Sequence, residues 1–338
     1  MMNIGQVLKI SVMGLIGAAM VQATRRRLNR MNLNGKIVLI TGGSRGLGLA
    51  LAKEFARRGA LLALCGRSDK HLQKVEEALR RTGAEVFTHS ADVTNIAQVE
   101  HLMQQVHARY GRIDILINNA GAMLVGPKDV MEVADYKKIM ETNCWSSLYC
   151  TQAIAPYFKV AGVGHIVNIT SIGGKIAVPH MLPYSVSKFA MMGLSQGLTA
   201  ELAAERIKVT TVVPNLMRTG SPRNITVKGH HRKEYAWFKI ADSLPFLSQS
   251  AANAAQQIVD GIAAEKVEIT LTLTAKIAIA LQALCPSIIA QTSGLANRLM
   301  PKSHNAVEKK GYESESMLSR NALTRTTDMA AQIYNQHE

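Results

Sequence analysis

Tyr184 and Lys188 are the two side chains of this sequence best suited to acid–base chemistry. They lie four positions apart, and on a helix residues at that spacing share one face. An ammonium group beside a phenol favours the phenolate and lowers a pKa that is otherwise about 10. The pair is therefore a candidate general acid–base. The spacing alone is weak evidence, because a packed tyrosine ring beside a solvated lysine has the same pattern.

A glycine-rich turn lies upstream, between a predicted strand and a predicted helix. Residues 36–41 are a short apolar run rich in β-branched side chains, and residues 49–58 favour a helix. Of the glycines between them, Gly42 suits a tight turn, Gly46 lets backbone approach a pyrophosphate, and Gly48 lets the helix pack closely on the strand. Strand, turn and helix in this order predict a dinucleotide-binding turn. The alternative is a turn that binds nothing.

The chain resembles the short-chain dehydrogenase/reductase family over roughly residues 35–266. The family's glycine pattern, Thr-Gly-x-x-x-Gly-x-Gly, matches residues 41–48, and its Tyr-x-x-x-Lys pair matches Tyr184 and Lys188. Ser171 precedes Tyr184 by thirteen positions, which is the family's spacing. Further landmarks occur in the family's order, namely Asp92, Val93, Asn118, Asn119, Ala120, Gly121 and Asn143.

The resemblance implies a role for each catalytic candidate. Tyr184 would protonate the substrate oxygen as hydride arrives, and Lys188 would lower the phenol pKa and bind the nicotinamide ribose. Ser171 would donate a hydrogen bond to the substrate oxygen, and Asn143 would hold a water that links Lys188 to solvent. The positions implied to contact the cofactor are Thr41, Gly42, Ser44, Arg45, Gly46, Leu47, Gly48, Arg67, Asp92, Val93, Asn119, Ala120, Gly121, Tyr184, Lys188, Pro214, Leu216 and Thr219.

Charge after the second predicted strand favours NADP(H) over NAD. Folds that take NAD usually place an acidic residue there, about 20 residues past the glycine turn, to bind the ribose hydroxyls. Residues 64–68 contain no acid and instead contain Arg67. Arg45, inside the glycine turn, is a second guanidinium, and two such groups suit a 2′-phosphate. Asp69 is the residue that keeps an NAD alternative open.

Strands alternate with helical segments, which predicts an α/β fold with a doubly wound, Rossmann-type parallel sheet. We expect one catalytic domain over residues 33–273, preceded by an anchor segment and basic stretch over 1–32 and followed by an extension over 274–338. Ser68 and Thr94 are the expected N-caps of the two helices that follow them.

One position departs from the family pattern. The family usually has Pro-Gly after the strand at residues 207–213, whereas here Asn215 follows Pro214. Asn tolerates left-handed backbone, so we expect the turn to survive. Between Thr219 and a helix beginning near Ser250 lies an insertion that we expect to cover the substrate or simply to pack on the core. Its apolar members are Tyr235, Trp237, Phe238, Ile240, Leu244, Pro245, Phe246 and Leu247.

The N-terminus predicts contact with a membrane. Residues 10–23 are apolar, and residues 25–27 with Arg30 supply a cluster of arginines directly afterwards. A span near 20 residues crosses a bilayer, and the arginines favour retention on the cytoplasmic side. We therefore expect an uncleaved anchor with the catalytic domain facing the cytoplasm. A helix lying on the membrane surface is the alternative.

The C-terminal extension carries weaker signals. Residues 267–273 predict one more strand, and residues 275–290 form an apolar stretch interrupted by Pro286. We expect this stretch to be a helix that packs near the substrate entrance or lies on the membrane. Residues 303–338 are expected to be a loosely docked tail, with Thr324 capping a last short helix.

Composition limits the partners. The net charge is +15, yet no nucleic-acid motif accompanies it, so anionic lipid is the expected partner. The four cysteines have neither metal-site nor disulfide spacing, in accord with a reducing compartment; they are Cys65, Cys144, Cys150 and Cys285. We predict no bound metal.

The sequence thus predicts a membrane-associated, NADPH-dependent reductase of a small apolar or lipid-like carbonyl compound. The resemblance suggests a homo-oligomer. The alternative function is an NADP-binding sensor or scaffold without turnover, against which the intact Ser171, Tyr184 and Lys188 argue.

Overall fold

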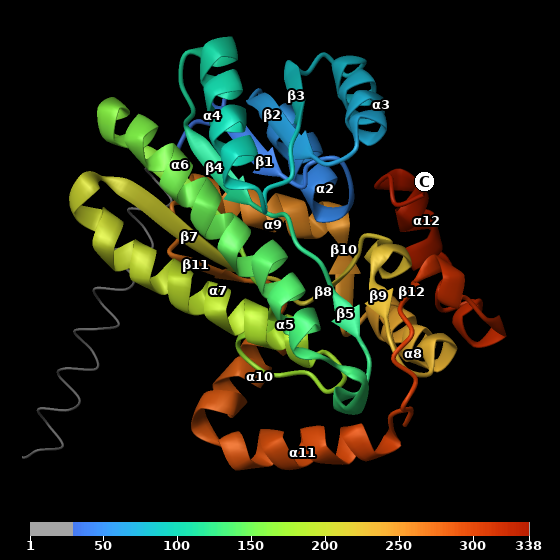
Figure 1. Cartoon of the computed structure of the whole chain (residues 1–338). Coiled ribbons are helices and arrows are strands. Elements are labelled where there is room, and N and C mark those ends of the chain that lie inside the picture. Colours follow the sequence, from blue (N-terminus) through green and yellow to red (C-terminus); the bar gives the residue numbers. More distant parts are fainter. Residues whose placement is uncertain (1–29, 338) are drawn as a thin grey trace, which may run out of the picture.

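A parallel seven-stranded sheet forms the centre of the computed structural model, which describes residues 30–337 (Figure 1). The strand order is β11-β7-β6-β4-β1-β2-β3. This arrangement confirms the predicted doubly wound α/β fold. The strands are β1 (Ile37–Thr41), β2 (Leu61–Gly66), β3 (Val86–Ser90), β4 (Ile115–Asn118), β6 (Gly164–Ile169), β7 (Ile207–Val213) and β11 (Glu268–Thr270).

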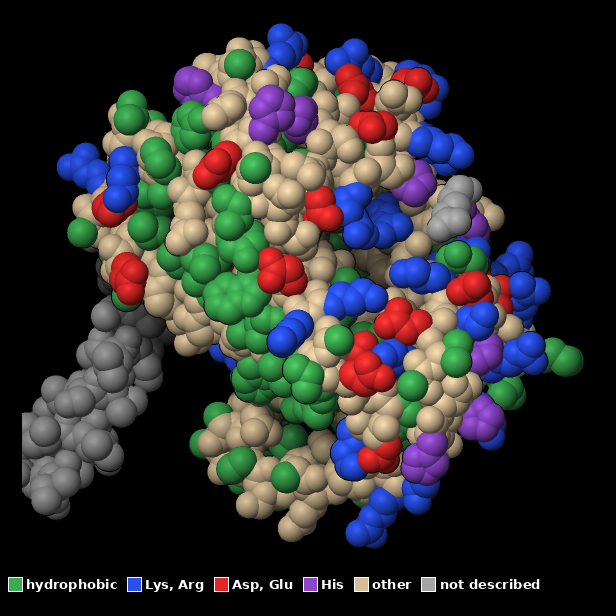
Figure 2. Space-filling view, viewed as in Figure 1, with side chains coloured by type: hydrophobic (Ala, Val, Ile, Leu, Met, Phe, Trp, Pro, Cys, Tyr) green, Lys and Arg blue, Asp and Glu red, His purple; other side chains and the backbone are tan. Residues whose placement is uncertain are grey.

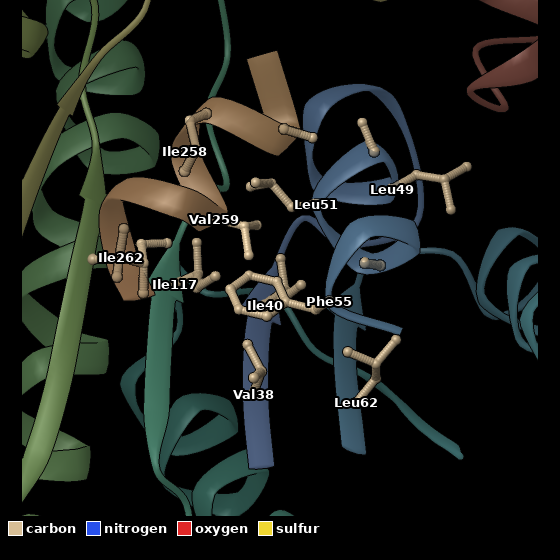
Figure 3. Packing of buried hydrophobic residues seen from close by; sticks show 14 of the residues in the cluster. Val38, Ile40, Leu49, Leu51, Phe55, Leu62, Ile117, Ile258, Val259 and Ile262 are labelled. Atoms are coloured by element: carbon tan, nitrogen blue, oxygen red, sulfur yellow. The ribbon is translucent and has the colours of Figure 1, made fainter. Parts of the chain in front are cut away.

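Helices cover both faces of the sheet. One face carries α2 (Gly46–Arg57), α3 (Asp69–Arg80) and α9 (Ala251–Ala263), and the other carries α4 (Ile96–Tyr110), α6 (Ser146–Ala161) and α7 (Leu182–Glu201). Because side chains alternate along a strand, Val38 and Ile40 of β1 enter the first core, while Ile37 and Leu39 enter the second. Figure 3 shows Phe55 of α2 packed over Val38 and Ile40. Each fully buried side chain of this size contributes about 1.5–3 kcal/mol.

The first residues of the helices show which of the predicted N-caps form. The Ser68 side chain accepts a hydrogen bond from the His71 backbone N–H, so this cap is confirmed. The Thr94 cap is wrong, because α4 begins one residue later and is capped by Asn95, which accepts from the backbone N–H of Gln98. Thr94 instead donates to the carboxylate of Asp92. The helix expected to begin near Ser250 is α9, and the Ser250 side chain caps it by accepting from the Asn253 backbone N–H.

A smaller layer lies beside the carboxyl ends of the central strands. It contains α8 (His231–Ser243), a three-stranded sheet and a two-stranded sheet. The short strands are β5 (Leu124–Val125), β8 (Leu216–Arg218), β9 (Thr226–Val227), β10 (Ser248–Ser250) and β12 (Lys309–Lys310). Between α4 and α6 the chain also forms α5 (Val133–Met140) and a π-helix, η2 (Glu141–Trp145). The insertion after Thr219 is therefore an ordered part of the fold.

The apolar stretch after β11 forms two helices instead of one. They are α10 (Leu273–Leu284) and α11 (Pro286–Leu299), which meet at 116°. Within residues 30–337 no single helix is long and apolar enough to cross a bilayer, although this bent pair passes that test when taken together. The anchor predicted over residues 10–23 lies outside the described residues.

The tail after α11 is docked, which corrects the expectation of loose attachment. It ends in α12 (Arg325–Ile333), where Ala331 is fully buried. Thr324 precedes this helix as predicted, but its side chain does not cap it. The Thr324 hydroxyl instead donates to the Ser319 carbonyl.

Candidate active site

The four catalytic candidates come from three neighbouring elements. Ser171 follows β6 and begins the short 3₁₀ helix η3 (Ile172–Gly174), Tyr184 and Lys188 lie on α7, and Asn143 lies in the π-helix η2. Parallel strands place their carboxyl ends at one edge of the sheet, where ligands bind in folds of this kind. The topology therefore brings these residues to the same edge as the glycine turn that follows β1.

Ser171 and Tyr184 form a hydrogen bond between their side chains. The Ser171 Oγ also accepts from the Gly173 backbone N–H at 3.0 Å, which fixes its orientation. Burial raises the pKa of Tyr184, and the bond from Ser171 partly opposes that rise. Tyr184 is therefore a protonated phenol at neutral pH, held beside a hydroxyl that can share a substrate oxygen.

Lys188 is buried at 5% exposure one turn after the tyrosine. Its ammonium donates to the Ile169 carbonyl at 2.9 Å and lies 5.8 Å from the centre of the Tyr184 ring. Burial lowers the pKa of Lys188 to about 8. The expectation of a lowered phenol pKa is wrong for the chain alone, because burial is the largest influence and raises the pKa of Tyr184.

Asn143 is fully buried, and both its amide oxygen and its amide nitrogen form hydrogen bonds to the protein. Its Oδ1 accepts from the Ala122 N–H at 2.7 Å, and its Nδ2 donates to the Ala122 carbonyl and to the Ser187 hydroxyl. Ser187 in turn donates to the Tyr184 carbonyl at 2.7 Å. Asn143 thus connects the π-helix η2 to α7 and to the loop that follows β4. Both amide hydrogens are used in these bonds, so neither is available to hold a water.

The glycine turn has the close approach that its sequence predicts. Gly42 has a φ of +63°, and a side chain at Gly48 would begin 2.1 Å from the Gly42 carbonyl oxygen. Asn119 braces the turn from the end of β4, since its Nδ2 donates to the Thr41 carbonyl at 2.9 Å. The Thr41 hydroxyl accepts from the N–H groups of Asn119 and Ala120. These contacts fix the shape of the turn.

Two arginines border the end of the groove beyond β2. Arg45 is the N-cap residue of α2, and Arg67 is exposed directly after β2. Their loops adjoin, because a side chain at Gly66 would begin 3.0 Å from Ser44 Oγ. Asp69 lies in the first turn of α3. This corner therefore carries two guanidinium groups and one carboxylate.

The remaining cofactor candidates lie along the same edge. Asp92 accepts from the Thr94 N–H and hydroxyl, while Val93 is buried beside it. A side chain at Gly121 would begin 3.8 Å from the Lys188 Nζ. On the other side of the groove, Leu216 begins β8, the Pro214 carbonyl accepts from Ile172 N–H, and the Thr219 hydroxyl accepts from the Ser221 N–H. Asn215 is not among the residues with positive φ, so the turn forms without left-handed backbone.

An apolar cluster lies against the inner side of Tyr184. Met181, Tyr235 and Phe238 form part of its buried core, and Tyr184 and Trp237 pack against it. Two members of the predicted lid, Tyr235 and Phe238, are therefore core residues, whereas Phe246 is 66% exposed.

Sequence reasoning missed two features of the site. Glu234 of α8 is fully buried and accepts from Trp237 Nε1 at 2.7 Å and pairs with His180 Nδ1 at 2.9 Å. The tail residues Asn335 and Gln336 lie against the glycine turn. No local pattern signalled either feature, because both join segments far apart in the chain.

A family model described as short chain dehydrogenase matches residues 36–228. The chain belongs to the short-chain dehydrogenase family. It is therefore an oxidoreductase that acts between an alcohol and a carbonyl group. The matched region contains the glycine turn, Asn143, Ser171, Tyr184 and Lys188.

Curated relatives in this family come from several kingdoms. The 11-beta-hydroxysteroid dehydrogenase-like 4A of Arabidopsis thaliana is 34% identical over 259 residues, which cover 76% of this chain and 83% of the relative. Dehydrogenase/reductase SDR family member 7B of Danio rerio is 32% identical, with 81% of this chain and 90% of the relative covered.

Solved structures share the short-chain dehydrogenase fold. A gluconate 5-dehydrogenase from Burkholderia cenocepacia, solved with NADP and tartrate, has a TM-score of 0.63 and 28% identity, covering 72% of this chain and 96% of its own. A short-chain dehydrogenase/reductase from Burkholderia phymatum, solved with NAD, has a TM-score of 0.69 at 24% identity, covering 76% and 96%.

Proposed function

We propose that this protein is a membrane-associated, NADPH-dependent reductase that converts an apolar ketone or aldehyde to an alcohol. The observation that carries the proposal is the hydrogen-bonded Ser171 and Tyr184 pair at the sheet edge that also holds the glycine turn. When bound, the nicotinamide cofactor supplies the hydride. The residues of the chain orient the carbonyl and deliver the proton.

Each catalytic side chain has one role in this proposal. The Tyr184 hydroxyl gives its proton to the substrate oxygen, and the Ser171 hydroxyl donates a second hydrogen bond to that oxygen. Lys188 places a positive charge behind the phenol, which stabilises the phenolate left after proton transfer. Asn143 positions α7 through Ser187.

The preference for NADPH rests on charge. Arg45 and Arg67 border the corner where the adenosine ribose of a dinucleotide lies in this fold, and no acid occupies the end of β2. Guanidinium groups bind phosphate well because their planar fork matches its oxygens. Solved structures of this fold hold either cofactor, NADP in the gluconate 5-dehydrogenase and NAD in the Burkholderia phymatum protein, so the proposed preference rests on the two arginines.

The apolar cluster beside Tyr184 supports an apolar substrate. Met181 and Phe238 are buried there, and Trp237 and Tyr184 pack against this cluster, so the tyrosine has apolar surroundings on this side. Ketones on a lipid-like or sterol-like skeleton fit this environment. The plant relative named as 11-beta-hydroxysteroid dehydrogenase-like is in keeping with that class.

Membrane association is supported by the helix pair α10 and α11. No residue of α11 is buried, and three of its exposed side chains are large and apolar, namely Ile288, Leu295 and Leu299. Leu281 and Leu284 of α10 are exposed as well, and hydrophobic side chains are visible on this segment at the bottom of Figure 2. An anionic bilayer surface would cover it and attract the basic chain. In this proposal residues 33–273 are the catalytic body and 274–338 an extension that adds the membrane contact.

Cofactor preference tests the proposal. Wild-type protein should turn over an accepted ketone at least about tenfold more efficiently with NADPH than with NADH, since charge-assisted bonds to a phosphate are worth about 1.5–3 kcal/mol. Arg67→Ala should lose most of that preference. Arg81→Ala, which removes an exposed arginine at the far end of α3, should keep it.

Two results would count against the proposal. Equal or better turnover with NADH in the wild type would remove the NADPH assignment. Binding of NADPH without turnover of any ketone or aldehyde would favour a sensor or scaffold.

A further inference from the structure

The last described residues of the chain lie on the glycine turn. The Gly46 N–H, at the first position of α2, donates to the Tyr334 carbonyl at 2.9 Å. The Asn335 side chain donates to the Ser44 carbonyl at 3.0 Å. Asn335 and Gln336 are 5% and 6% exposed, so this is a packed contact.

The Gln336 side chain fills the space directly over the turn. A Cβ placed on Gly46 would lie 2.6 Å from Gln336 Nε2 and 4.0 Å from the Cβ of Thr219. The end of the Gln336 side chain therefore lies against the Gly46 backbone, with Thr219 also close to that glycine. Asn224 holds the side chain there, because its Nδ2 donates to the Gln336 side-chain Oε1 at 2.5 Å and to the Gln336 backbone carbonyl at 3.0 Å.

The tail reaches this position because α12 is anchored on α8. Lys239 pairs with Asp328 at 2.7 Å, and the Ser243 and Thr327 hydroxyls share a buried hydrogen bond of 2.7 Å. Ala331 packs so closely on the turn after β8 that a side chain at Gly220 would begin 2.3 Å from the Ala331 Cα. These contacts of α12 therefore hold residues 334–336 against the glycine turn.

The N-terminus of a helix is where this fold binds the cofactor diphosphate, through backbone N–H groups. The Gly46 N–H and the space above it cannot serve the diphosphate and the tail together. We infer that residues 334–336 are a built-in competitor of the cofactor, which must displace them to bind. This inference rests on the proposed cofactor site.

The docked tail also carries a feature that favours its release. Asn335 has a φ of +54°, and its Oδ1 is buried with no hydrogen-bond partner among the described residues. An unpaired buried acceptor costs free energy that exposure to water returns. Because coupling between two ligands of one site is reciprocal, cofactor binding loosens the tail and tail release strengthens cofactor binding.

Full-length variants at Asn335 test the inference. Proline fixes φ near −65°, so Asn335→Pro expels residues 334–336 while α12 keeps its support. Glycine accepts positive φ, so Asn335→Gly keeps the turn and loses only the bond to Ser44. In NADPH titrations followed by fluorescence, we expect the Kd to fall at least about tenfold for Asn335→Pro and about threefold or less for Asn335→Gly. The control His337→Ala, at an exposed position, should match the wild type.

Hydrogen exchange on the wild type provides a readout that needs no substitution. Saturating NADP⁺ should increase exchange at the amides of residues 334–337, whereas the amides of α9 should stay protected. If the NADPH Kd of Asn335→Pro and the exchange at residues 334–337 are both unchanged, residues 334–336 do not compete with the cofactor, although the proposed cofactor site would still hold. A weaker Kd in Asn335→Pro would overturn it by showing that the tail helps to bind cofactor. Absence of NADPH and NADH binding in every variant would overturn both.

Discussion

Tyr184 depends on neighbours that reach it from different parts of the chain. Ser171 arrives from the end of β6 and bonds to the phenol, while Lys188 comes from the next turn of α7 and bonds to the Ile169 carbonyl. Burial therefore keeps the tyrosine protonated, and a hydrogen bond to a backbone carbonyl holds the lysine in place. This division suits reduction, because the phenol must begin the reaction with its proton and needs the cation only after losing it.

Lys188 sets an expected pH limit on reduction. Its pKa is lowered by burial to about 8, so it is charged below that pH and neutral above it. The charge stabilises the phenolate of Tyr184, so kcat for NADPH-linked reduction should fall as the pH rises through about 8. The measurement is kcat between pH 6 and pH 10 at saturating NADPH and ketone.

Lys188→Arg supplies the comparison for this pH profile. A guanidinium stays charged throughout this range, so the variant should have lower kcat but no decline near pH 8. An identical decline in both proteins would show that another group controls it.

Some properties of single residues cannot be predicted from the local sequence. The positions of Ser171, Tyr184 and Lys188 follow from spacing, because each lies at the end of a strand or on one face of a helix. The direction of the Tyr184 pKa does not follow, since it depends on burial by Met181, Trp237 and other residues of distant segments. The bond from Asn335 to the glycine turn spans almost the whole chain and has no local signature.

At the scale of elements, strands were easier to predict than the ends of helices. β7 has the bounds expected from its β-branched run, and β1 begins one residue later than expected, because buried strands are continuous apolar runs. The start of α4 was misplaced because Thr94 and Asn95 are both good caps and the Thr94 hydroxyl is taken by Asp92. The apolar stretch after β11 divides at Cys285, one residue before Pro286, since proline favours the first turn of a helix.

Cys285 allows the membrane contact of α10 and α11 to be tested directly. It is the exposed thiol at the bend between these helices, whereas Cys65, Cys144 and Cys150 are buried. A polarity-sensitive dye on Cys285 should shift its emission to the blue when vesicles of phosphatidylcholine with anionic phosphatidylglycerol are added, because the apolar surface around it enters the headgroup region.

The matched control moves the dye to another exposed site. Cys285→Ser combined with Met317→Cys places it on the tail, at a residue that is 93% exposed, and no shift is expected there. A dye on Cys285 that keeps its aqueous emission would contradict membrane contact by this helix pair.

For the whole molecule, the fold follows from the order of its elements. Alternating strands and helices with a glycine turn after β1 restrict the chain to a doubly wound sheet, and the ligand edge follows from that topology. The docking of α12 on α8 and on the turn after β8 does not follow, because it depends on the ion pair of Lys239 with Asp328 and on the close contact of Gly220 with Ala331. Long-range packing of a polar tail is decided by such contacts and not by local preference.

Proton delivery by Tyr184 is the central claim, and Tyr184→Phe tests it most directly. The measurement is NADPH oxidation by wild type and variant over a panel of long-chain, cyclic and sterol-like ketones, together with the NADPH Kd of both proteins. Removing a general acid costs about 10²–10⁴ in rate, so we expect reduction to fall by about that factor while the Kd changes by less than about threefold. Undiminished turnover by Tyr184→Phe of any ketone that the wild type reduces would contradict the account.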